Sequence, residues 1–377
     1  MPGPSESSPL RHADPLLLAL PFALSGLGLL MIYSSSKTRL ATQGLSTLYY
    51  VERQSLAIVL GIVAMGVVLA VDYRRIRDLW VLVYLAVLPL LIGVLVIGSR
   101  HKGAQAWFQV GPLQFQPSEI TKIVVVVAVA GYCHQHRDDL DTGRLAVGIA
   151  LAGLMMALVF LQHDLGTTLV ILVCSFSVLV VAGLRPMHIG ILLLIGVTLV
   201  GAAIVTGKVA AYRVDRIVGF LDQSNASQPA SKQTQAEYSL NESKIAIVNG
   251  GLAGEGLFHG RQTNLAYVPE QHTDFIFTVV GEELGFLGGA TLIGLYGLLV
   301  WRVWRTARLS SDFFGTLLAV GVLGIFAFQV FENIGMTMGI MPITGIPLPF
   351  MSYGGSAIIA SFIAVGLVAN VNMRRFS

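Results

Sequence analysis

The residues with the clearest chemical potential lie in the segment Val268–Phe277, which reads Val-Pro-Glu-Gln-His-Thr-Asp-Phe-Ile-Phe. It places His272 and Asp274 directly before a long apolar run that is typical of a membrane-spanning helix. The first turn of a helix has unpaired N–H groups and a partial positive charge, so a carboxylate there tends to stay ionised. Such an aspartate is suited to accept a proton from a substrate held at the bilayer surface. The simpler interpretation is that Asp274 only caps the helix, a common place for aspartate.

Three further carboxylates adjoin predicted helix starts or tight turns beside apolar runs, where charge is costly and therefore often functional: Glu119, Asp164 and Glu270. Glu119 and Lys122 are three residues apart, a spacing that predicts an ion pair on one helix face and explains both without a catalytic role. Asp164 lies in a predicted tight turn between two spans, where a turn or cap carboxylate explains it equally well.

An inverting glycosyl transfer needs one carboxylate as general base, to deprotonate the attacking hydroxyl. A phosphate-ester leaving group needs cations more than it needs an acid. Seven basic residues are predicted on the same side of the membrane as Asp274: Arg100, Lys102, Lys122, Arg213, Arg216, Lys244 and Arg261. Taken singly, each is better explained as a solvated or lipid-headgroup-binding side chain. His272 has no second His or Cys at ligand spacing, so no protein zinc site is expected.

The composition identifies the broad class of protein. Of 377 residues, 54% are hydrophobic and 12% are charged, whereas soluble globular proteins carry about 25% charged residues. We therefore expect an all-α polytopic membrane protein. The net charge of +3 gives no indication of nucleic-acid binding. The two cysteines, Cys133 and Cys174, lie in or beside apolar runs and are predicted to be core thiols.

Apolar runs of about 17–25 residues predict ten transmembrane helices. Their approximate bounds are 16–33, 55–71, 79–98, 118–133, 146–161, 168–184, 188–206, 275–300, 313–333 and 351–371. We expect one membrane domain, 1–377, with tails at 1–14 and 372–377 and a long loop, 207–274, between helices seven and eight. A Gly-rich turn series in the second half of that loop predicts a backbone that folds back tightly.

Basic residues predict the orientation, because cytoplasmic loops carry an excess of Lys and Arg. With a cytoplasmic N-terminus, twelve of the 24 basic residues fall on inner segments and six on short outer loops. The remaining six lie in loop 207–274, whose length exempts it from the rule. We therefore expect both termini in the cytoplasm, and the long loop with Asp274 outside.

Other residues have structural explanations. Trp107 is typical of an aromatic belt at a membrane interface. Glu282 and Glu283 are predicted to point to different faces of their helix, with at least one bonded to a neighbouring helix. Glycines and prolines between Gly345 and Gly355 predict backbone that lines a cavity.

Seven sequence blocks, in order along most of the chain, resemble the SEDS family of cell-wall proteins (shape, elongation, division and sporulation), which includes RodA and FtsW. They are 103–107, 115–119 with Lys122, 164–167, 268–277, 281–285, 333–336 and 342–355. The residues in these blocks are more similar to those of RodA than to those of FtsW. The chain departs from the family at His163, where Pro is usual, at Gln223, again in place of Pro, and at Glu255, where a basic or bulky residue is common.

The resemblance implies a ten-helix peptidoglycan glycosyltransferase in the bacterial cytoplasmic (inner) membrane, active in cell elongation and cell shape. Its implied substrate is lipid II, a disaccharide-pentapeptide on undecaprenyl pyrophosphate, and its implied partner is a class B penicillin-binding protein, the transpeptidase. The family's essential aspartate falls on Asp274, and its cavity carboxylates fall on Glu119 and Asp164. We expect the substrate cavity to include Trp107, Glu119, Lys122, Asp164, Arg216, Lys244, Glu270, His272, Thr273 and Ser352.

The resulting hypothesis is an outward-facing enzyme in which Asp274 deprotonates the acceptor sugar, with or without Mg²⁺ or Mn²⁺ at the pyrophosphate. Membrane lipids are expected around the bundle, and no nucleic acid. A lipid II flippase is one alternative, because it also needs a polar cavity within the bundle. A non-catalytic scaffold of the elongation or division machinery is the other.

Overall fold

The computed structural model describes residues 12–101, 104–110, 113–139, 141–184 and 235–376. Within these ranges nine helices have 18 or more residues, about the length that crosses a bilayer. They are α1 (Pro15–Thr42), α2 (Tyr49–Ala70), α4 (Trp80–Ile97), α5 (Pro117–Gln135), α6 (Thr142–Leu161), α7 (Leu165–Ala182), α12 (Ile276–Leu309), α13 (Phe313–Met338) and α14 (Gly355–Met373). Eight of them are also apolar enough to span, and α5 is the exception.

Nine of the ten predicted spans coincide with these helices, and the tenth, 188–206, lies outside the described residues. Two helices extend well past their apolar runs: α1 ends at Thr42 and α12 at Leu309, where the sequence predicts 33 and 300. The added turns carry basic residues such as Arg39 and Arg302, which end a hydropathy pattern but do not end a helix that projects beyond the hydrocarbon.

Shorter elements connect the spans. They are α3 (Tyr73–Asp78), the 3₁₀ helix η2 (Arg137–Asp139), α10 (Gln235–Gly250) and α11 (Arg261–Leu265). Three antiparallel strands, β1 (Ser99–His101), β2 (Ala104–Val110) and β3 (Leu113–Phe115), form a small sheet in the order β1-β2-β3. The all-α expectation missed this sheet, because β1 and β3 have only three residues each and the seven residues of β2 do not alternate regularly between apolar and polar.

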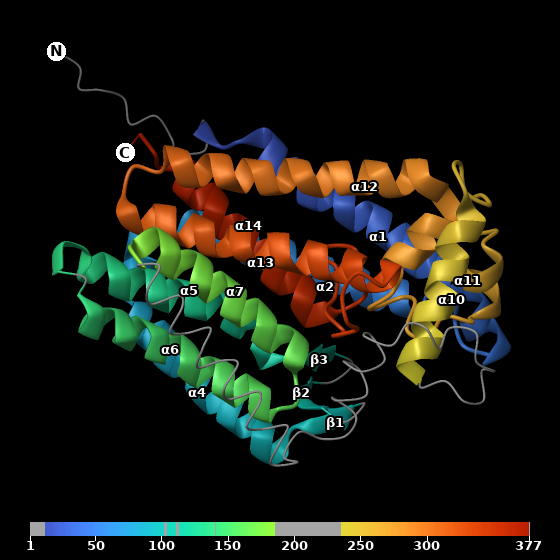
Figure 1. Cartoon of the computed structure of the whole chain (residues 1–377), viewed down its shortest axis with the longest axis horizontal. Helices are drawn as coiled ribbons and strands as arrows, with labels where there is room; N and C mark the ends of the chain where they lie inside the picture. Colours follow the sequence, from blue (N-terminus) through green and yellow to red (C-terminus); the bar gives the residue numbers. More distant parts are fainter. Residues whose placement is uncertain (1–11, 102–103, 111–112, 140, 185–234, 377) are drawn as a thin grey trace.

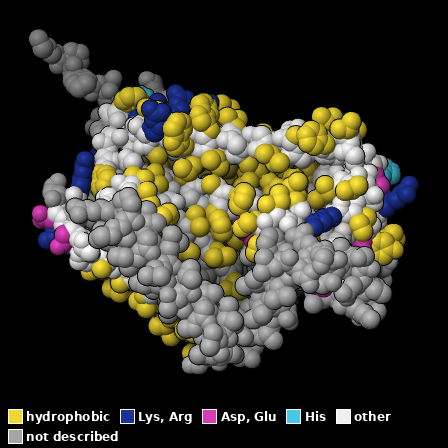
Figure 2. All heavy atoms as spheres, viewed as in Figure 1, with side chains coloured by type: hydrophobic (Ala, Val, Ile, Leu, Met, Phe, Trp, Pro, Cys, Tyr) yellow, Lys and Arg dark blue, Asp and Glu magenta, His cyan; other side chains and the backbone are white. Residues whose placement is uncertain are grey.

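The long helices run between two ends of the molecule (Figure 1). The start of α1, the end of α14 and the turn from α12 to α13 lie at one end, here named the terminal end. The strands, α10, α11 and the start of α12 lie at the other, the sheet end. On the face shown in Figure 2, hydrophobic side chains spread across the middle and most charged side chains gather toward the two ends. A protein that crosses a bilayer has this distribution.

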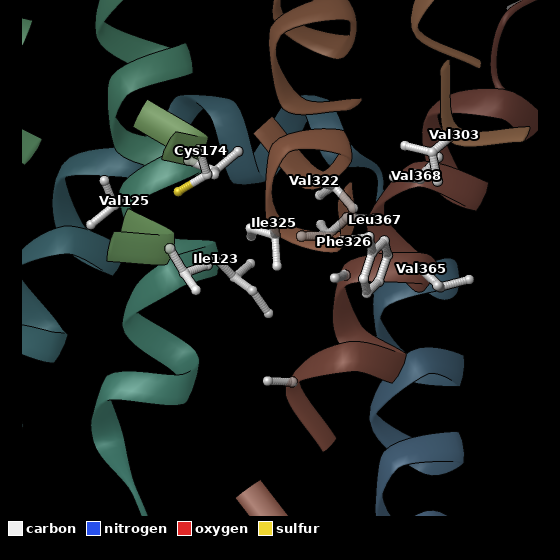
Figure 3. Close-up of a cluster of buried hydrophobic side chains, with 14 of the residues drawn as sticks. Ile123, Val125, Cys174, Val303, Val322, Ile325, Phe326, Val365, Leu367 and Val368 are labelled. Carbon is white, nitrogen blue, oxygen red and sulfur yellow. The ribbon is translucent and has the colours of Figure 1, made fainter. Parts of the chain in front are cut away.

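The interior of the bundle is apolar at mid-depth. Ile123 of α5 lies in one cluster with Cys174 of α7, Ile325 of α13 and Val365 of α14 (Figure 3). Cys174 and Cys133 are buried free thiols, as their apolar surroundings predicted. This core fixes the helices whose ends at the sheet end carry the polar residues described below.

α12 is broken near its start at Gly285, where φ is 64° and ψ is −161°. Four backbone hydrogen bonds of 2.9–3.1 Å join segment 251–256 to the residues on either side of the break. A Cβ at Gly254 would overlap the carbonyl group of Glu283, so only glycine allows this approach. Non-helical backbone within a membrane protein requires such substitute partners. The Gly-rich turns therefore fold back tightly, as predicted, and they do so against α12.

Candidate active site

Asp274 lies at the sheet end, in the turn that leads into α12. The helix begins at Ile276, its N-cap residue is Phe275, and Phe275 makes no side-chain cap hydrogen bond. Asp274 therefore precedes the cap position, so its interpretation as the N-cap residue is wrong. The Asp274 residue is partly exposed, as a group that meets a substrate must be.

Two neighbours hold Asp274 in place. Its carbonyl oxygen accepts a 2.8 Å hydrogen bond from Nδ2 of Asn333, a fully buried residue of α13 that also donates to the Ile346 carbonyl at 2.8 Å. On the side-chain side, Gly345 faces the carboxylate. A Cβ at Gly345 would lie 3.3 Å from Oδ2 of Asp274, and its φ of +77° favours glycine. The loop between α13 and α14 therefore passes directly beside the carboxylate.

Buried polar side chains fix this loop, residues 339–354. Gln54 of α2 donates from Nε2 to the Ser352 carbonyl at 3.0 Å, and its Oε1 accepts from the Gly354 N–H at 3.1 Å. Oγ of Ser352 donates to the Thr273 carbonyl at 2.6 Å and accepts from the Leu348 N–H at 2.8 Å. The predicted residues Ser352 and Thr273 thus join the loop to the turn that carries the aspartate.

The turn itself is anchored by His272, which is buried and forms a ring cluster with two tyrosines that also contact each other. The His272 ring centroid is 4.5 Å from that of Tyr50 and 5.7 Å from that of Tyr353. Burial raises the pKa of Tyr353 above its usual value, so that hydroxyl stays protonated at neutral pH. Glu270 has a φ of +55°, and its carbonyl accepts the Thr273 N–H at 3.1 Å. The predicted Glu270, His272 and Thr273 therefore shape the approach to α12.

Asp164 is the N-cap of α7, which confirms the cap interpretation. Its Oδ1 accepts from the Thr167 N–H at 3.0 Å. Its Oδ2 accepts from Nε2 of Gln116 at 2.9 Å and from Oγ of Ser118 at 3.2 Å, so it also ties α7 to the start of α5. The preceding His163 has a φ of +67°, which proline cannot adopt. The backbone conformation at this position therefore excludes proline.

Glu119 and Lys122 form the predicted ion pair, with 2.7 Å between Oε2 and Nζ. Each side chain is only 4% exposed, in the first two turns of α5. A buried pair of this kind contributes little net stability, yet loss of one partner leaves an uncompensated charge. The pair therefore holds two opposite charges in fixed positions in the same helix whose start binds Asp164.

Loop 339–354 brings the two aspartate positions to one region. A Cβ on Gly166, at the start of α7, would lie 2.7 Å from Cγ1 of Ile346 and 3.1 Å from the Thr344 carbonyl. The loop thus touches Asp274 on one side and the α7 start that carries Asp164 on the other. The predicted residues that contact this loop or the elements directly bound to it are Glu119, Lys122, Asp164, Glu270, His272, Thr273, Asp274 and Ser352.

The other predicted residues lie at the margin of this region or outside the described chain. Lys244 of α10 lies against Gly339, the C-cap residue of α13. A Cβ added to Gly339 would lie 2.6 Å from Nζ of Lys244. An ammonium group is favoured at a helix C-terminus by the helix dipole. Trp107 is partly buried in β2, and its carbonyl accepts from Oγ of Ser99 at 3.0 Å. Arg216 lies outside the described residues.

Glu282 and Glu283 are both fully buried and bind different elements, as predicted. Glu282 accepts from the N–H groups of Gln262 and Thr263, at the start of α11, at 2.6 and 2.9 Å. Glu283 accepts a hydrogen bond from the hydroxyl of Ser34 in α1. These carboxylates join the start of α12, next to its break at Gly285, to α11 and α1.

Three polar residues of the region were not predicted as site residues from the sequence: Gln54, Gln116 and Asn333. Each satisfies backbone or carboxylate groups that are distant in the chain. In the sequence, each of the three is an amide side chain at the edge of an apolar run, a position that indicates burial. A buried amide needs hydrogen-bond partners. That signal predicts a hydrogen bond but not its partner.

Comparison with known proteins identifies the family and the relatives of this chain. Residues 15–376 match the family described as cell cycle protein, FtsW/RodA/SpoVE. The peptidoglycan glycosyltransferase MrdB of Escherichia coli K12 is 38% identical over 371 residues, 97% of this chain and 94% of MrdB. Relatives named probable peptidoglycan glycosyltransferase FtsW, from Geobacter, are 33–35% identical over nearly the same length.

Solved structures agree in fold. A chain from a peptidoglycan synthase complex, described as coordinating polymerization and crosslinking, superposes with a TM-score of 0.78 at 32% identity and covers 97% of this chain and 99% of that one. The rod shape determining protein RodA of Thermus thermophilus superposes with a TM-score of 0.72 at 31% identity, over 99% and 100% of the two chains. The similarity to RodA agrees with the sequence blocks, and FtsW is nearly as similar.

Proposed function

This chain belongs to the SEDS family, the FtsW/RodA/SpoVE cell cycle proteins, and we propose that it polymerises lipid II into the glycan strands of peptidoglycan. Its relatives of similar length are named peptidoglycan glycosyltransferases, and eight of its described helices are long and apolar enough to span a membrane. The observation that carries the mechanism is the placement of Asp274. Its carboxylate is partly exposed at the sheet end, beside Gly345, on a backbone held by Asn333.

In the proposed reaction two lipid-linked substrates lie side by side with their chains in the bilayer. The Asp274 carboxylate takes the proton of the GlcNAc 4-hydroxyl of the acceptor. The hydroxyl oxygen attacks the anomeric carbon of the donor MurNAc, the bond from that carbon to the pyrophosphate oxygen breaks, and undecaprenyl pyrophosphate leaves with the electron pair. The new glycosidic bond has inverted configuration. A positioned base contributes about 10²–10⁴-fold, and holding both substrates together contributes further through proximity.

We assign the remaining predicted residues to the substrate cavity around this base. The buried Glu119–Lys122 pair and the Asp164 cap support a polar wall next to loop 339–354. Lys244 of α10 and Arg216 of the long loop are proposed to neutralise the pyrophosphate, and Trp107 to contact lipid or sugar. In the described part of the chain no three His, Cys, Asp or Glu side chains gather at a metal site. A divalent ion, Mg²⁺ or Mn²⁺, would therefore arrive with the substrate pyrophosphate, because Mg²⁺ is commonly held by phosphates plus one or two carboxylates.

We place the sheet end at the outer face of the bacterial cytoplasmic membrane and both chain termini in the cytoplasm. The basic side chains of the terminal end support this orientation, because cytoplasmic segments are enriched in Lys and Arg. Among the described residues that end carries Arg74, Arg75, Arg77, Arg137, Arg144, Arg302, Arg305, Arg308, Arg374 and Arg375. With this orientation Asp274 meets lipid II on the side where cell wall is built.

A class B penicillin-binding protein is the proposed partner, and cell elongation the proposed process. The similarity to a chain of a complex described as joining polymerization and crosslinking supports this pairing. A partner that crosslinks the product must lie where the strand emerges, which by the orientation above is the outer face.

The function is tested by incubating the purified chain with lipid II in detergent, with and without the penicillin-binding partner, and separating glycan products by gel. Moenomycin is included to suppress contaminating polymerases. Detergent removes sidedness, so polymer formed there supports the enzyme. Lipid II movement in sealed vesicles with no polymer in detergent would instead identify a flippase.

A further inference from the structure

A second polar site lies at the terminal end, about 40 Å from Asp274 by the rise of α12. An open cavity of about 270 Å³ lies there between the start of α1, the end of α12 and the residues at and just after the end of α14. Its polar lining residues are His12, Asp14, Arg302, Arg305, Asn372 and Arg375. Nothing in the proposed transfer reaction uses these residues.

Three arginines line this cavity with one carboxylate, and that carboxylate is already engaged. Oδ1 of Asp14 accepts from the N–H groups of Leu16 and Leu17 at 3.1 and 3.3 Å, and so caps α1. Oδ2 of Asp14 accepts from Nη1 of Arg302 at 3.0 Å. Neither Arg305 nor Arg375 forms an ion pair with any described residue. The described side chains that line the cavity therefore carry an excess of positive charge.

The guanidinium groups also have unused donors. Nε of Arg302 and Nε of Arg375 are buried and find no hydrogen-bond acceptor among the described residues. A buried N–H without an acceptor is destabilising, and more so on a charged group. An oxyanion with several oxygens would satisfy both the charge and the donors, and guanidinium groups bind phosphate oxygens in this way.

The surroundings indicate a lipid as the source of that anion. Trp301 and Trp304, on the same turns of α12 as the arginines, are 45% and 42% exposed, and Phe376 at the end of the chain is 71% exposed. Large aromatics with outward faces at the end of a membrane helix are typical of the headgroup level. A phosphate bound here would have apolar surface beside it, which suits acyl chains and does not suit a free ion.

We propose that this cavity binds the phosphodiester headgroup of an anionic phospholipid from the leaflet at the terminal end. The three guanidinium groups hold the phosphate oxygens, and the acyl chains lie along the outer face of α12. The bound lipid would link α1, α12 and α14 at their ends. The proposal is independent of the reaction at Asp274, so the two can fail separately.

The test is native mass spectrometry of the full chain released from detergent, titrated with dioleoylphosphatidylglycerol or with dioleoylphosphatidylcholine. The first lipid is anionic, the second has no net charge, and their chains are the same. The variant Arg305→Gln/Arg375→Gln keeps the Arg302–Asp14 pair intact. An arginine near a lipid phosphate strengthens binding by about fivefold. Loss of two arginines should therefore weaken the binding of phosphatidylglycerol about 25-fold. Arg308→Gln, on the same helix but outside the cavity, should bind it as the unaltered chain does.

Arg305→Lys/Arg375→Lys retains both charges and should retain most of the binding, which separates loss of charge from loss of fold. If the double glutamine variant does not fold, Arg305→Gln alone gives the same comparison with a fivefold effect. Equal binding of the two lipids, or unchanged binding in the glutamine variants, would overturn the proposal. Displacement of phosphatidylglycerol by millimolar inorganic phosphate would also overturn it, since it would identify a site for free phosphate.

Discussion

Gly345 offers a sharp test of how the site is built, because among the described residues beyond its chain neighbours an added methyl group there contacts the proposed base alone. A Cβ on Gly345 would lie 3.3 Å from Oδ2 and 3.9 Å from Cγ of Asp274, and apart from the residues next to Gly345 no other described residue has an atom within 4 Å of it. Gly44, in the turn after α1, has a similar positive φ, +69° against +77°, and a Cβ on Gly44 would meet no atom within 4 Å in the described part of the chain beyond the neighbouring residues. Gly345→Ala and Gly44→Ala therefore share one effect and differ in another.

The shared effect is backbone strain. A left-handed conformation costs an L-residue roughly 1–2 kcal/mol, so both variants should lose about that much stability. The difference is at the carboxylate, where a 3.3 Å contact displaces Oδ2 by a few tenths of an ångström. Because a misplacement of 1 Å can lower a rate about 100-fold, a displacement of this size corresponds to about 4- to 10-fold in kcat.

Both variants should be purified and compared in a lipid II polymerisation assay that resolves kcat and KM, with thermal unfolding measured in parallel. We expect Gly345→Ala to lower kcat by that factor with little change in KM, and Gly44→Ala to keep normal kinetics at a similar loss of stability. An equal loss of kcat in the two variants, or a rise in KM alone for Gly345→Ala, would refute the reasoning.

The remaining predictions concern stability. Gly254→Ala should lower the melting temperature steeply, because the added Cβ would overlap the Glu283 carbonyl and push segment 251–256 away from the break in α12. Lys122→Met should cost about 3–5 kcal/mol of unfolding free energy by leaving Glu119 buried and unpaired, and adding Glu119→Gln should restore much of it in the same denaturation assay. Burial raises the pKa of Glu242 on α10 above its usual 4.5, so the stability supplied by its protonated form is present below pH 4.5 and is lost as the pH rises through the folded-state pKa. Glu242→Gln should therefore raise the melting temperature at pH 7 and leave it unchanged at pH 4; a gain of equal size at both pH values would contradict this.

Features set by local sequence were predictable. The spans follow from apolar runs, the Glu119–Lys122 pair from its spacing, and the Asp164 cap from its place in a turn. Each depends on residues within a few positions of one another. The limits of the spans were less predictable, because Arg39 and Arg302 continue helices past the apolar stretch.

Features set by contacts between distant segments were not predictable. Gln54 and Ser352 meet although they are 298 positions apart, and Asn333 reaches back to Asp274 over 59 positions. At the break at Gly285, segment 251–256, some 30 residues earlier, supplies the backbone hydrogen-bond partners that the helix itself does not supply there. A single sequence shows that such polar groups need partners, but the partners follow only from the packing of the whole bundle.

The role of Asp274 is tested most directly by Asp274→Asn, which keeps the size of the side chain and removes its basicity. Asp139→Asn is the matched control, since Asp139 is 77% exposed at the terminal end and pairs only on the surface with Arg144. In detergent, with lipid II and moenomycin, we expect Asp274→Asn to polymerise 10²–10⁴-fold more slowly and Asp139→Asn to polymerise normally. Near-normal polymer from a folded Asp274→Asn protein would contradict the assignment of the base.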